Sequence, residues 1–557
     1  MMLRRALFIA VFVTALVSID AAERIPGTAA IASAHPLATE AGHEILAAGG
    51  NAFDAAVAVA AALAVVEPNG SGLGGGGFFL LHRTSEGADT LIDARETAPA
   101  AATRDMFLDA QGKPIPKLST ESALAAAIPG EPAGMAMLAE KYGRLPLKKS
   151  LQPAIRFARE GFPVNARLQE RITGKLEIFK QARETRRIFL KDSQVPPLGY
   201  VIKQPDLART LELLANQGSD GYYEGAFARR LAAGVRKLGG IWTEKDLAGY
   251  RVVERKPVVG SYRGARIVSA PPPSSGGIAL IDALNILEPY NLPALEPTAR
   301  KHLIVEALRR AYRDRAIYLG DPDFVEVPVE RLTSKFYADG QRTSLRLDRA
   351  TPSEMLPSDA IAANQGPNTT HFSVMDRDGN RVAATLTINL WFGSGIVVPG
   401  TGILLNNEMD DFSMKPGVPN AFQLIGAEAN AIEPGKRPLS SMTPTFVESP
   451  HGMLIAGSPD GSLIISMVVL ATLDFMEGKS ALDILKSPRI HHQYFPDVIR
   501  YEPTALSEAE RAALTALGHK LEGDEPWGNM QVITWDYGSG EVEAGSDSRG
   551  VGVAVIR

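Results

Sequence analysis

Three polar residues are predicted to meet at one end of a β-hairpin, where they could hold a nucleophile. A strand-like run lies on each side of residues 377–379, which fit a three-residue loop with its glycine in the left-handed conformation. That loop sets Thr369 opposite Thr387 and places Asn389 one step further on the same face. A two-residue loop would put Ile388 there instead, and the alternative to a reactive site is a solvated strand end.

A threonine at a chain N-terminus can act as a nucleophile without help from another residue. Its hydroxyl attacks, and its own α-amine serves as the base. Thr369 would gain that amine if the chain were cut after Asn368. The sequence contains no cysteine, and it has no Gly-x-Ser-x-Gly elbow, so these two common nucleophiles are excluded. The composition therefore suits a threonine nucleophile that uses its own α-amine as the base.

Other motifs that suggest cofactors do not have the context they need. The glycines of Ser71–Gly77 follow a predicted helix and precede a strand, the reverse of the order in a nucleotide-binding loop. Asp376, Asp378 and Asn380 begin like a calcium loop, but Arg381 stands where the glycine should be, so a hairpin turn is predicted. The histidines show no metal-ligand spacing. We predict neither a metal nor a cofactor.

The surrounding elements must position the hairpin, and their patterns predict layers of helices and strands. A helix from Asn51 to Val66 is apolar on every side and is expected to be buried between layers. Residues 353–368 are polar and are interpreted as an exposed linker. Further helices are predicted at 37–48, 153–160, 206–216, 226–238 and 298–318, and strands at 77–82, 371–376 and 381–388. This pattern favours a layered α/β sandwich.

The bulk properties limit the partners and the location of the protein. The chain has 557 residues, a formal net charge of −5 and a pI near 6.1, which argues against a nucleic acid or membrane surface as partner. Residues 1–22 have a basic start, a short apolar run and small residues at the end, as a signal peptide does. We expect a periplasmic or secreted protein that acts on a small molecule or peptide.

Long motifs in both halves of the chain resemble the γ-glutamyltransferase (glutathione hydrolase) family. The resemblance runs in the same order over about residues 25–555. In the first half it is carried by residues 71–78, Asp93-Ala94-Arg95-Glu96-Thr97-Ala98-Pro99, 271–277 and 318–323. In the second half it is carried by Thr369-Thr370-His371-Phe372-Ser373-Val374, 387–389, Gly402-Ile403-Leu404-Leu405-Asn406-Asn407-Glu408-Met409-Asp410-Asp411-Phe412-Ser413 and Lys436-Arg437-Pro438-Leu439-Ser440-Ser441-Met442-Thr443-Pro444.

The resemblance implies an N-terminal-nucleophile hydrolase fold, an αββα four-layer sandwich, made as a precursor that cuts itself between Asn368 and Thr369. A signal peptide (1–22) would precede a large subunit (23–368) and a small subunit (369–557), and the two subunits would form a heterodimer. By motif, Thr369 is the nucleophile and Thr387 orients it. The remaining roles also follow by motif: Arg95, Ser440 and Ser441 for the substrate α-carboxylate, Asn389, Glu408 and Asp411 for the α-ammonium, and the backbone N–H groups of Asp460 and Gly461 for the oxyanion hole.

The implied substrate and these residue types agree chemically. A γ-glutamyl group is a zwitterion, so its recognition needs a guanidinium fork for the carboxylate and acidic groups for the ammonium. The alternative for Arg95 is a structural ion pair with Glu96 or Asp93. The alternative for Glu408 and Asp411 is a solvated acidic loop.

Two loops complete the comparison with the family. Residues 415–422 resemble a lid over the pocket, with Phe422 where an aromatic residue often stands. The sequence departs from the family at Asp460, because the family has two consecutive glycines at 460 and 461. We expect the Asp460 side chain to point away from the pocket, toward backbone N–H groups or a basic neighbour.

The predicted activity is cleavage of the γ-glutamyl amide of glutathione and related compounds through a γ-glutamyl-threonine ester. Water, amino acids or dipeptides would accept the γ-glutamyl group. The first alternative is a cephalosporin acylase on the same fold, which would cut glutaryl amides that lack an ammonium. The second is a catalytically impaired periplasmic binding protein, an idea motivated only by Asp460.

Overall fold

The computed structural model describes residues 25–356, 369–415 and 418–557. The expected signal segment 1–22, the neighbouring residues 23–24, Asn368 and two residues of the expected lid, 416 and 417, lie outside this range. Among the described residues, none of the helices combines the length and the apolar composition needed to cross a bilayer.

Seven strands of the described chain form the first sheet, in the order β18-β1-β9-β10-β2-β3-β6, and every neighbouring pair is antiparallel. The strands β9 and β10 therefore lie between β1 and β2, which come from the start of the chain. The bounds are β1 (Ala30–Ser33), β2 (Gly76–Arg83), β3 (Ala88–Ala94), β6 (Val253–Arg255), β9 (Thr370–Met375), β10 (Arg381–Thr387) and β18 (Val553–Ile556).

The second sheet of the described residues has six antiparallel strands in the order β17-β16-β12-β11-β8-β7. Its strands are β7 (Val258–Tyr262), β8 (Ala265–Ser269), β11 (Thr445–Glu448), β12 (Gly452–Gly457), β16 (Gln531–Asp536) and β17 (Val542–Ser546). Two small sheets, made of β4 (Phe162–Pro163) with β5 (Val201–Ile202) and of β13 (Ile490–His491), β14 (Ile499–Tyr501) and β15 (Leu521–Gly523), lie apart from the central pair.

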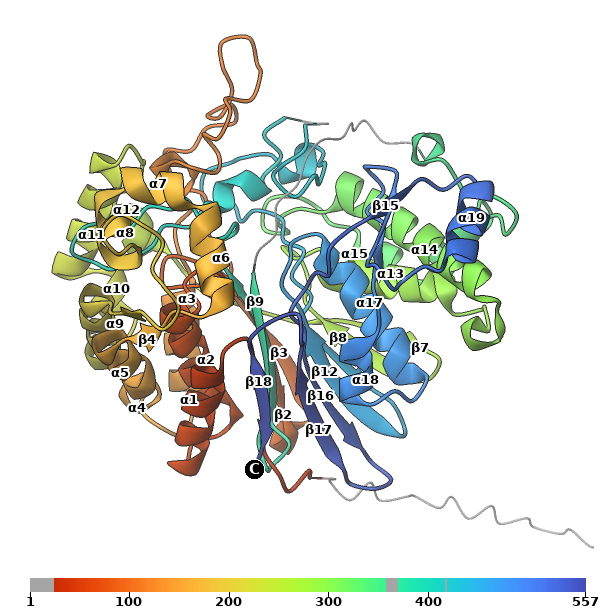
Figure 1. Ribbon diagram of the computed structural model, residues 1–557, viewed down its shortest axis with the longest axis horizontal. Coiled ribbons are helices and arrows are strands. Elements are labelled where there is room, and N and C mark those ends of the chain that lie inside the picture. The colour runs from red at the N-terminus through yellow and green to blue at the C-terminus, as the bar shows by residue number, and fades with distance from the viewer. Residues whose placement is uncertain (1–24, 357–368, 416–417) are drawn as a thin grey trace, which may run out of the picture.

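The two large sheets face each other, and helices cover both outer faces (Figure 1). Helices from the first half of the chain cover the first sheet: α1 (Pro36–Ala47), α2 (Ala52–Val66) and α3 (Glu131–Tyr142), with α4 (Leu147–Ser150), α5 (Gln152–Glu160) and α9 (Pro205–Gln217) packed outside them. The second sheet is covered by α13 (Gly276–Leu287), α17 (Leu463–Met476) and α18 (Ala481–Lys486), with α14 (Pro297–Tyr318) outside. The expected layered α/β sandwich is therefore observed.

The remaining helices lie further from the sheets, on the two flanks of the molecule (Figure 1). They are α6 (Ala166–Gly174), α7 (Leu176–Gln181), α8 (Arg183–Phe189), α10 (Asp220–Tyr223), α11 (Gly225–Lys237), α12 (Glu244–Gly249), α15 (Val329–Leu332), α16 (Lys335–Arg342) and α19 (Glu508–Ala516).

Helix α2 is buried along its whole length, as its uniformly apolar sequence predicts. Asn51 and Asp54 form a capping box at its start, in which the side chain of each accepts a hydrogen bond from the backbone N–H of the other. The carboxylate of Asp376, in the hairpin turn, accepts a further bond from the N–H of Ala52. This contact ties the start of α2 to the turn between β9 and β10.

The predicted hairpin register is confirmed. Leu386 pairs with Thr370, which sets Thr387 next to Thr369 beyond the last pair, and Gly379 has a φ of 86° in the turn. The prediction that Asn389 continues the strand is wrong. Asn389 has a φ of 69°, because its N–H turns back to donate to the Thr387 hydroxyl at 2.8 Å.

The glycine run before β2 allows two backbones to pass very close to each other. A Cβ atom on Gly75 would lie 2.0 Å from the carbonyl oxygen of Thr387, and one on Gly76 would lie 2.3 Å from that of Ala94. Both carbonyls belong to residues at the ends of strands that lead into the predicted site. These glycines therefore set the backbone around that site.

The interpretation of residues 353–368 as an exposed linker is wrong at its beginning. Residues Ser353–Met355 form a short 3₁₀ helix, and Ser353 is fully buried. Its N–H donates to Asp497 and its hydroxyl donates to the carbonyl of Tyr494, so the second half of the chain holds it in place. Residues 357–368 lie outside the described residues.

Candidate active site

Most of the predicted site residues line one small pocket, which we call the inner pocket. It encloses only about 20 Å³, little more than the space of one water molecule. The predicted residues Asp460 and Asn368 do not line it. Asp460 faces a neighbouring cavity, and Asn368 lies outside the described residues. The inner pocket is lined by Arg95, Thr369, Thr387, Asn389, Glu408, Asp411, Phe422, Leu424, Ser440, Ser441, Met442, Gly461 and Ile464.

Thr369 lies at the end of the hairpin, directly before β9, and is 8% exposed. The hydroxyl oxygen of Thr387 accepts a hydrogen bond from the N–H of Asn389, which leaves its own proton to be donated. The side-chain amide of Asn389 donates to the carbonyl of Asn407 at 2.8 Å. The amide oxygen of Asn389 is buried without a partner among the described residues, and it belongs to a pocket residue.

Arg95 directly follows β3 and is completely buried. The hydroxyl of Tyr250 fixes its carbonyl, and Asp93 accepts a bond from its N–H. Its guanidinium donates to the carbonyl of Pro438 at 3.1 Å, to Asp411 at 2.6 Å and to Glu408. The expected alternative, a structural pair with Glu96 or Asp93, is present in part, because Glu96 lies 3.6 Å from the guanidinium, while Glu408 and Asp411 lie closer to it.

Acidic groups outnumber the basic group at this position. One guanidinium serves the carboxylates of Glu96, Glu408 and Asp411. Burial raises the pKa of Glu96 to about 7, and it also raises the pKa of Glu408, in spite of the nearby arginine. Burial alone would lower the pKa of Arg95, but Glu408 and Asp411 outweigh it and raise that pKa. A second cation would therefore be stabilised here.

Glu408 and Asp411 come from a 3₁₀ helix, Glu408–Asp411, and do not form the solvated loop considered as an alternative. Glu408 is 1% exposed and the Asp411 side chain is 11% exposed. One carboxylate oxygen of Glu408 and the hydroxyl of Ser441 have no hydrogen-bond partner among the described residues. Buried polar atoms without partners are costly, so their presence around a pocket indicates a site built for a polar ligand.

Ser440 and Ser441 reach the inner pocket from a segment held on both sides by backbone bonds. The N–H of Ser440 donates to the carbonyl of Pro273, and its own carbonyl accepts from the N–H of Ser275. The hydroxyl oxygen of Ser440 accepts a bond from Met442, which leaves the hydroxyl proton available. Ser440 and Ser441 therefore line the same pocket as Arg95.

The turn Asp460–Gly461 directly precedes helix α17, so its backbone N–H groups lie at a helix N-terminus, where negative charge is stabilised. Asp460 has a φ of 91° and Gly461 a φ of 54°, so the aspartate occupies a conformation that favours glycine. The Asp460 carboxylate accepts a hydrogen bond from the N–H of Gly528. Burial raises the pKa of Asp460, although Arg167 and this hydrogen bond oppose the change.

Phe422 closes the inner pocket over Gly461. A Cβ on Gly461 would lie 2.2 Å from the phenyl ring, so only glycine permits this contact. Phe422 is 8% exposed, and its N–H donates to the side chain of Asn420. The same Asn420 donates to Asp411 at 3.2 Å. The loop that carries the aromatic ring is therefore tied to one of the acidic residues of the pocket.

Glu67 adjoins the site but had no role in the sequence interpretation. It is the partly buried C-cap residue of α2, and it accepts a 2.6 Å hydrogen bond from the hydroxyl of Thr370, the residue after Thr369. Burial raises the pKa of Glu67 to about 7. A sequence signal existed, since Glu67 is the acid that ends a helix otherwise made of apolar residues after Asp54.

One group of potential metal ligands is present elsewhere in the described chain. Ligand atoms of His302, Glu306 and His519 lie within 4.8 Å of one another. The two imidazoles are hydrogen-bonded to each other at 2.8 Å, and Glu306 is paired with Arg309 and Arg310. These ligand atoms are already used in protein contacts, and the group is distinct from the inner pocket.

Comparisons with known proteins agree with the geometry. Residues 38–556 match the family described as Gamma-glutamyltranspeptidase. The glutathione hydrolase proenzyme of Escherichia coli is 44% identical over 526 residues, which cover 94% of this chain and 90% of that protein. The γ-glutamyltranspeptidase structure from Helicobacter pylori is 44% identical with a TM-score of 0.57, over 58% of this chain and 93% of that one. A cephalosporin acylase structure from Bacillus halodurans has a TM-score of 0.83 at 30% identity, over 95% of both chains.

Proposed function

The chain belongs to the γ-glutamyltranspeptidase family, and from this premise we propose that it is a glutathione hydrolase that cleaves γ-glutamyl amides through Thr369. The single observation that carries the substrate assignment is the acidic excess around Arg95 in the inner pocket. A γ-glutamyl group brings one carboxylate and one ammonium. Its carboxylate would take the Arg95 fork, and its ammonium would replace the guanidinium as the partner of Glu408 and Asp411. The total charge of the pocket would stay unchanged.

The reaction we propose proceeds through an ester on Thr369. The Thr369 hydroxyl loses its proton to the α-amine of the same residue and attacks the γ-glutamyl amide carbon. The C–N bond then breaks, and the leaving amine takes the proton. Water, an amino acid or a dipeptide attacks the ester in the same way and releases the γ-glutamyl group as glutamate or as a new amide. The hydroxyl of Thr387, free to donate, would orient the nucleophile.

The oxyanion formed in each step would lie at the turn before α17. We assign its stabilisation to the backbone N–H groups of Asp460 and Gly461, which the helix N-terminus supports. An aspartate keeps its backbone N–H, and its carboxylate is bound to Gly528. The departure from two glycines therefore does not by itself remove a donor. Phe422 would exclude water from the ester and influence the balance between hydrolysis and transfer.

The acylase alternative has a specific structural relative but does not fit the charges as well. A glutaryl group has the carboxylate of a γ-glutamyl group but no ammonium. Bound at Arg95, it would leave Glu408 and Asp411 without a cation in a buried pocket, which is costly. The second alternative, an impaired binding protein, rested on Asp460, whose side chain lies in the neighbouring cavity.

The proposal includes maturation. A cut between Asn368 and Thr369 would free the α-amine that the mechanism needs, and would divide the mature chain into a large subunit, 23–368, and a small subunit, 369–557. The E. coli relative is named a proenzyme, which supports this step. We also propose that residues 1–22 direct export to the periplasm or the medium, because they have the pattern of a signal peptide.

The decisive test is an assay of purified protein on two chromogenic anilides that differ only in the ammonium, γ-glutamyl and glutaryl. We expect the γ-glutamyl compound to be cleaved at least about tenfold faster in kcat/KM, with further release when an acceptor dipeptide is added. Preference for the glutaryl compound would identify an acylase. Binding without any release of the anilide would identify the impaired binding protein.

A further inference from the structure

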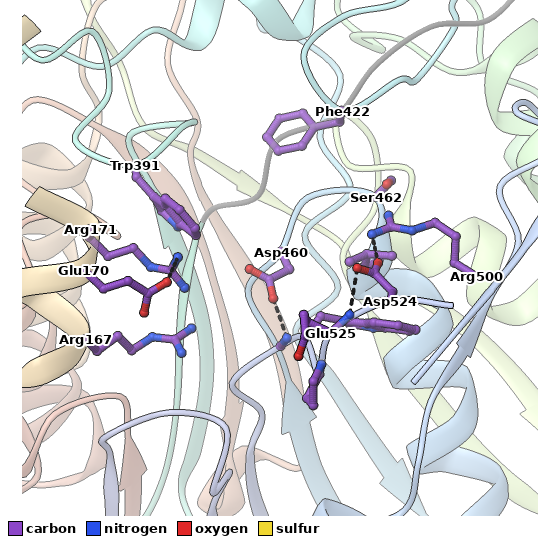
Figure 2. Close-up of a pocket in the computed structure, with 14 residues that line it drawn as sticks. Arg167, Glu170, Arg171, Trp391, Phe422, Asp460, Ser462, Arg500, Asp524 and Glu525 are labelled. Carbon is purple, nitrogen blue, oxygen red and sulfur yellow. Dashed lines mark hydrogen bonds and ion pairs between the residues drawn. The ribbon is translucent and has the colours of Figure 1, made fainter. Parts of the chain in front are cut away.

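The C-terminal end of α14 is held against two segments that carry residues of the inner pocket. The hydroxyl of Tyr312 donates to the carbonyl of Ser462, the first residue after the turn before α17. One turn later, the carbonyl of Ala316 accepts a 3.0 Å bond from the N–H of Ala427, in the segment that follows the expected lid. Ser462 also lines the neighbouring cavity that Asp460 faces, which we call the outer cavity (Figure 2). This end of an outer-layer helix therefore reaches inward to the candidate site.

Arg315 is buried in this end of α14 without an acidic partner. It is 4% exposed. Among the described residues its guanidinium forms no ion pair, and its Nε donates to the hydroxyl oxygen of Ser275 at 3.0 Å. Burial lowers the pKa of Arg315 to about 10, although the charge of Asp411 opposes this change. Burying an unpaired charge costs folding free energy, so the presence of this arginine indicates a role in binding.

The charge of Arg315 acts on the inner pocket. Two of the charged groups that shift its pKa are pocket residues, since Asp411 raises that pKa and Arg95 lowers it. The guanidinium groups of Arg95 and Arg315 repel each other, and an anion that enters the pocket would relieve this repulsion. A substrate carboxylate bound at Arg95 would be such an anion. Its negative charge would then be stabilised by both arginines.

Hydrogen bonds also connect Arg315 to Ser440. The hydroxyl oxygen of Ser275 accepts from Arg315, and its proton is donated to the carbonyl of Ser440 at 2.6 Å. The N–H of Ser275 donates to the same carbonyl at 2.8 Å. Ser440 carries one of the two hydroxyl groups that the resemblance assigns to the substrate carboxylate. The buried guanidinium therefore fixes, through one intervening side chain, the backbone that positions this hydroxyl.

The residues beside Ser275 hold the same segment at further points. The hydroxyl of Ser274 donates to the carbonyl of Met442 at 2.6 Å. A Cβ atom on Gly276 would lie 2.2 Å from the hydroxyl oxygen of Thr443, so only glycine permits this approach. Residues 274–276 therefore pack closely against 440–443, and a displacement of the first segment would displace the serines of the pocket.

We propose that Arg315 is a positioning residue of the site for the substrate α-carboxylate. It fixes Ser440 through Ser275, and its charge adds to that of Arg95 when the carboxylate is bound. The inference rests on the proposed function, because it names a further determinant of the same γ-glutamyl site. Arg315 does not line the inner pocket as the structure describes it, so it acts without touching the substrate.

The test uses the mature enzyme with a γ-glutamyl anilide and with the same anilide whose α-carboxylate is an amide. The ratio of the two kcat/KM values isolates recognition of the carboxylate, because the scissile bond and the ammonium are unchanged. We expect the wild type to prefer the acid by at least about 10²-fold, since the amide loses a bidentate ionic pair.

Three variants separate the charge of Arg315 from its hydrogen bond. R315Q removes the charge and should lower the preference for the acid by about tenfold. R315K keeps a charge but not the planar fork, so it should lower the preference by a smaller factor. S275A leaves the arginine but breaks its connection to Ser440, and it should lower the preference by about threefold, as expected for one lost hydrogen bond.

A purely structural role would reduce cleavage of both anilides by the same factor and leave their ratio unchanged. R300Q is the control, because Arg300 belongs to the same helix, pairs with Glu477 and lines neither the inner pocket nor the outer cavity. Its ratio should equal that of the wild type.

The inference requires the ratio to fall in both R315Q and S275A, and an unchanged ratio in either variant would overturn it. S275A removes a single hydroxyl group, so it decides the question even if R315Q does not fold. In that outcome, cleavage of the γ-glutamyl anilide by the wild type still supports the proposed function. A wild type that cleaves no γ-glutamyl donor would overturn both.

Discussion

The inner pocket and the outer cavity meet at one turn, but their charges are arranged differently. In the inner pocket the guanidinium of Arg95 is enclosed by three carboxylates in about 20 Å³. In the neighbouring cavity that Asp460 faces, the outer cavity, Arg167 and Arg171 of one helix face about 280 Å³ and have Glu170 and Asp460 as acidic neighbours. The difference indicates two kinds of recognition. A zwitterion can exchange partners with the paired charges of the first, whereas the arginine side of the second favours an anionic group.

The largest effect should come from removing the proposed nucleophile, Thr369, which lines the inner pocket. Thr369→Ala is expected to lower kcat/KM by at least about 10⁴-fold and to leave the precursor as one uncut chain, because no second hydroxyl can take both roles. Intact mass spectrometry and the anilide assay measure the two results. Thr515→Ala, at an exposed position of α19, is the control. Finding an active preparation that consists only of full-length chain would contradict the maturation step.

The second largest effect on kcat/KM is expected for Arg95. In the proposed complex its guanidinium binds the substrate carboxylate, and the substrate ammonium takes its place beside Glu408 and Asp411. Arg95→Ala should cost about 2–4 kcal/mol in kcat/KM for γ-glutamyl donors, since it leaves buried carboxylates without their partner. Arg95→Lys should restore little of this loss, because a single ammonium cannot replace the fork. Steady-state kinetics on the γ-glutamyl anilide give both values. If Arg95→Lys behaves like the wild type, bidentate geometry is not what the pocket recognises.

Glu67 connects the two regions. It accepts a hydrogen bond from Thr370, and the charges of Arg167 and Arg171 act on its carboxyl group. Its pKa is about 7 in the folded protein against an ordinary 4.5, so the folded state keeps a proton that the unfolded state has lost between these values. This carboxyl therefore makes stability fall as pH rises toward 7, by up to about 3 kcal/mol. Glu67→Gln, which cannot ionise, should escape that loss.

The measurement for Glu67 is the difference between variant and wild type in urea unfolding midpoints at pH 4.5 and pH 8. The variant should gain relative to the wild type at the higher pH. A difference that stays constant between the two pH values would show that Glu67 does not titrate as its burial implies.

The smallest effect is expected at the turn between the regions. Asp460→Gly should change kcat by less than about tenfold, or about 1.4 kcal/mol, because the carboxylate is bound to Gly528 and the backbone donor remains. Strain at the φ of 91° would be relieved by glycine, which favours a small gain. A rise of about 10²-fold in the anilide assay would instead mean that the native protein is an impaired catalyst.

The inner pocket could be predicted from sequence because its residues lie in long motifs or at fixed positions of a hairpin. A three-residue turn with Gly379 determines the register, and the register brings Thr369 to Thr387. The direct pairing of Arg95 with Glu408 could not be predicted, since it depends on how two distant segments pack in the absence of substrate. Likewise, Ser353 was predicted to lie in an exposed linker, because its hydrogen-bond partners, Asp497 and Tyr494, lie far along the chain.

The outer cavity was beyond the sequence interpretation for the same physical reason. It is assembled from single residues of α6, of the loop that carries Trp391, of the turn at Asp460 and of the loop at 524–528. None of these segments contains a motif that predicts its contact with the others. Arg167 and Arg171 lie on one face of α6, but no helix was predicted at residues 166–174.

The order of strands in the first sheet has a consequence for the two proposed subunits. Strands β9 and β10, from residues after 368, are hydrogen-bonded on one side to β1 and on the other to β2, and β18 closes the far side of β1. A cut after Asn368 would therefore divide the chain without creating a separable interface. Releasing either piece would mean breaking the hydrogen bonds in the middle of a sheet, so dilution should not dissociate the folded pair. Unfolding would release two separate chains, so the melting temperature of the cut protein should rise with protein concentration.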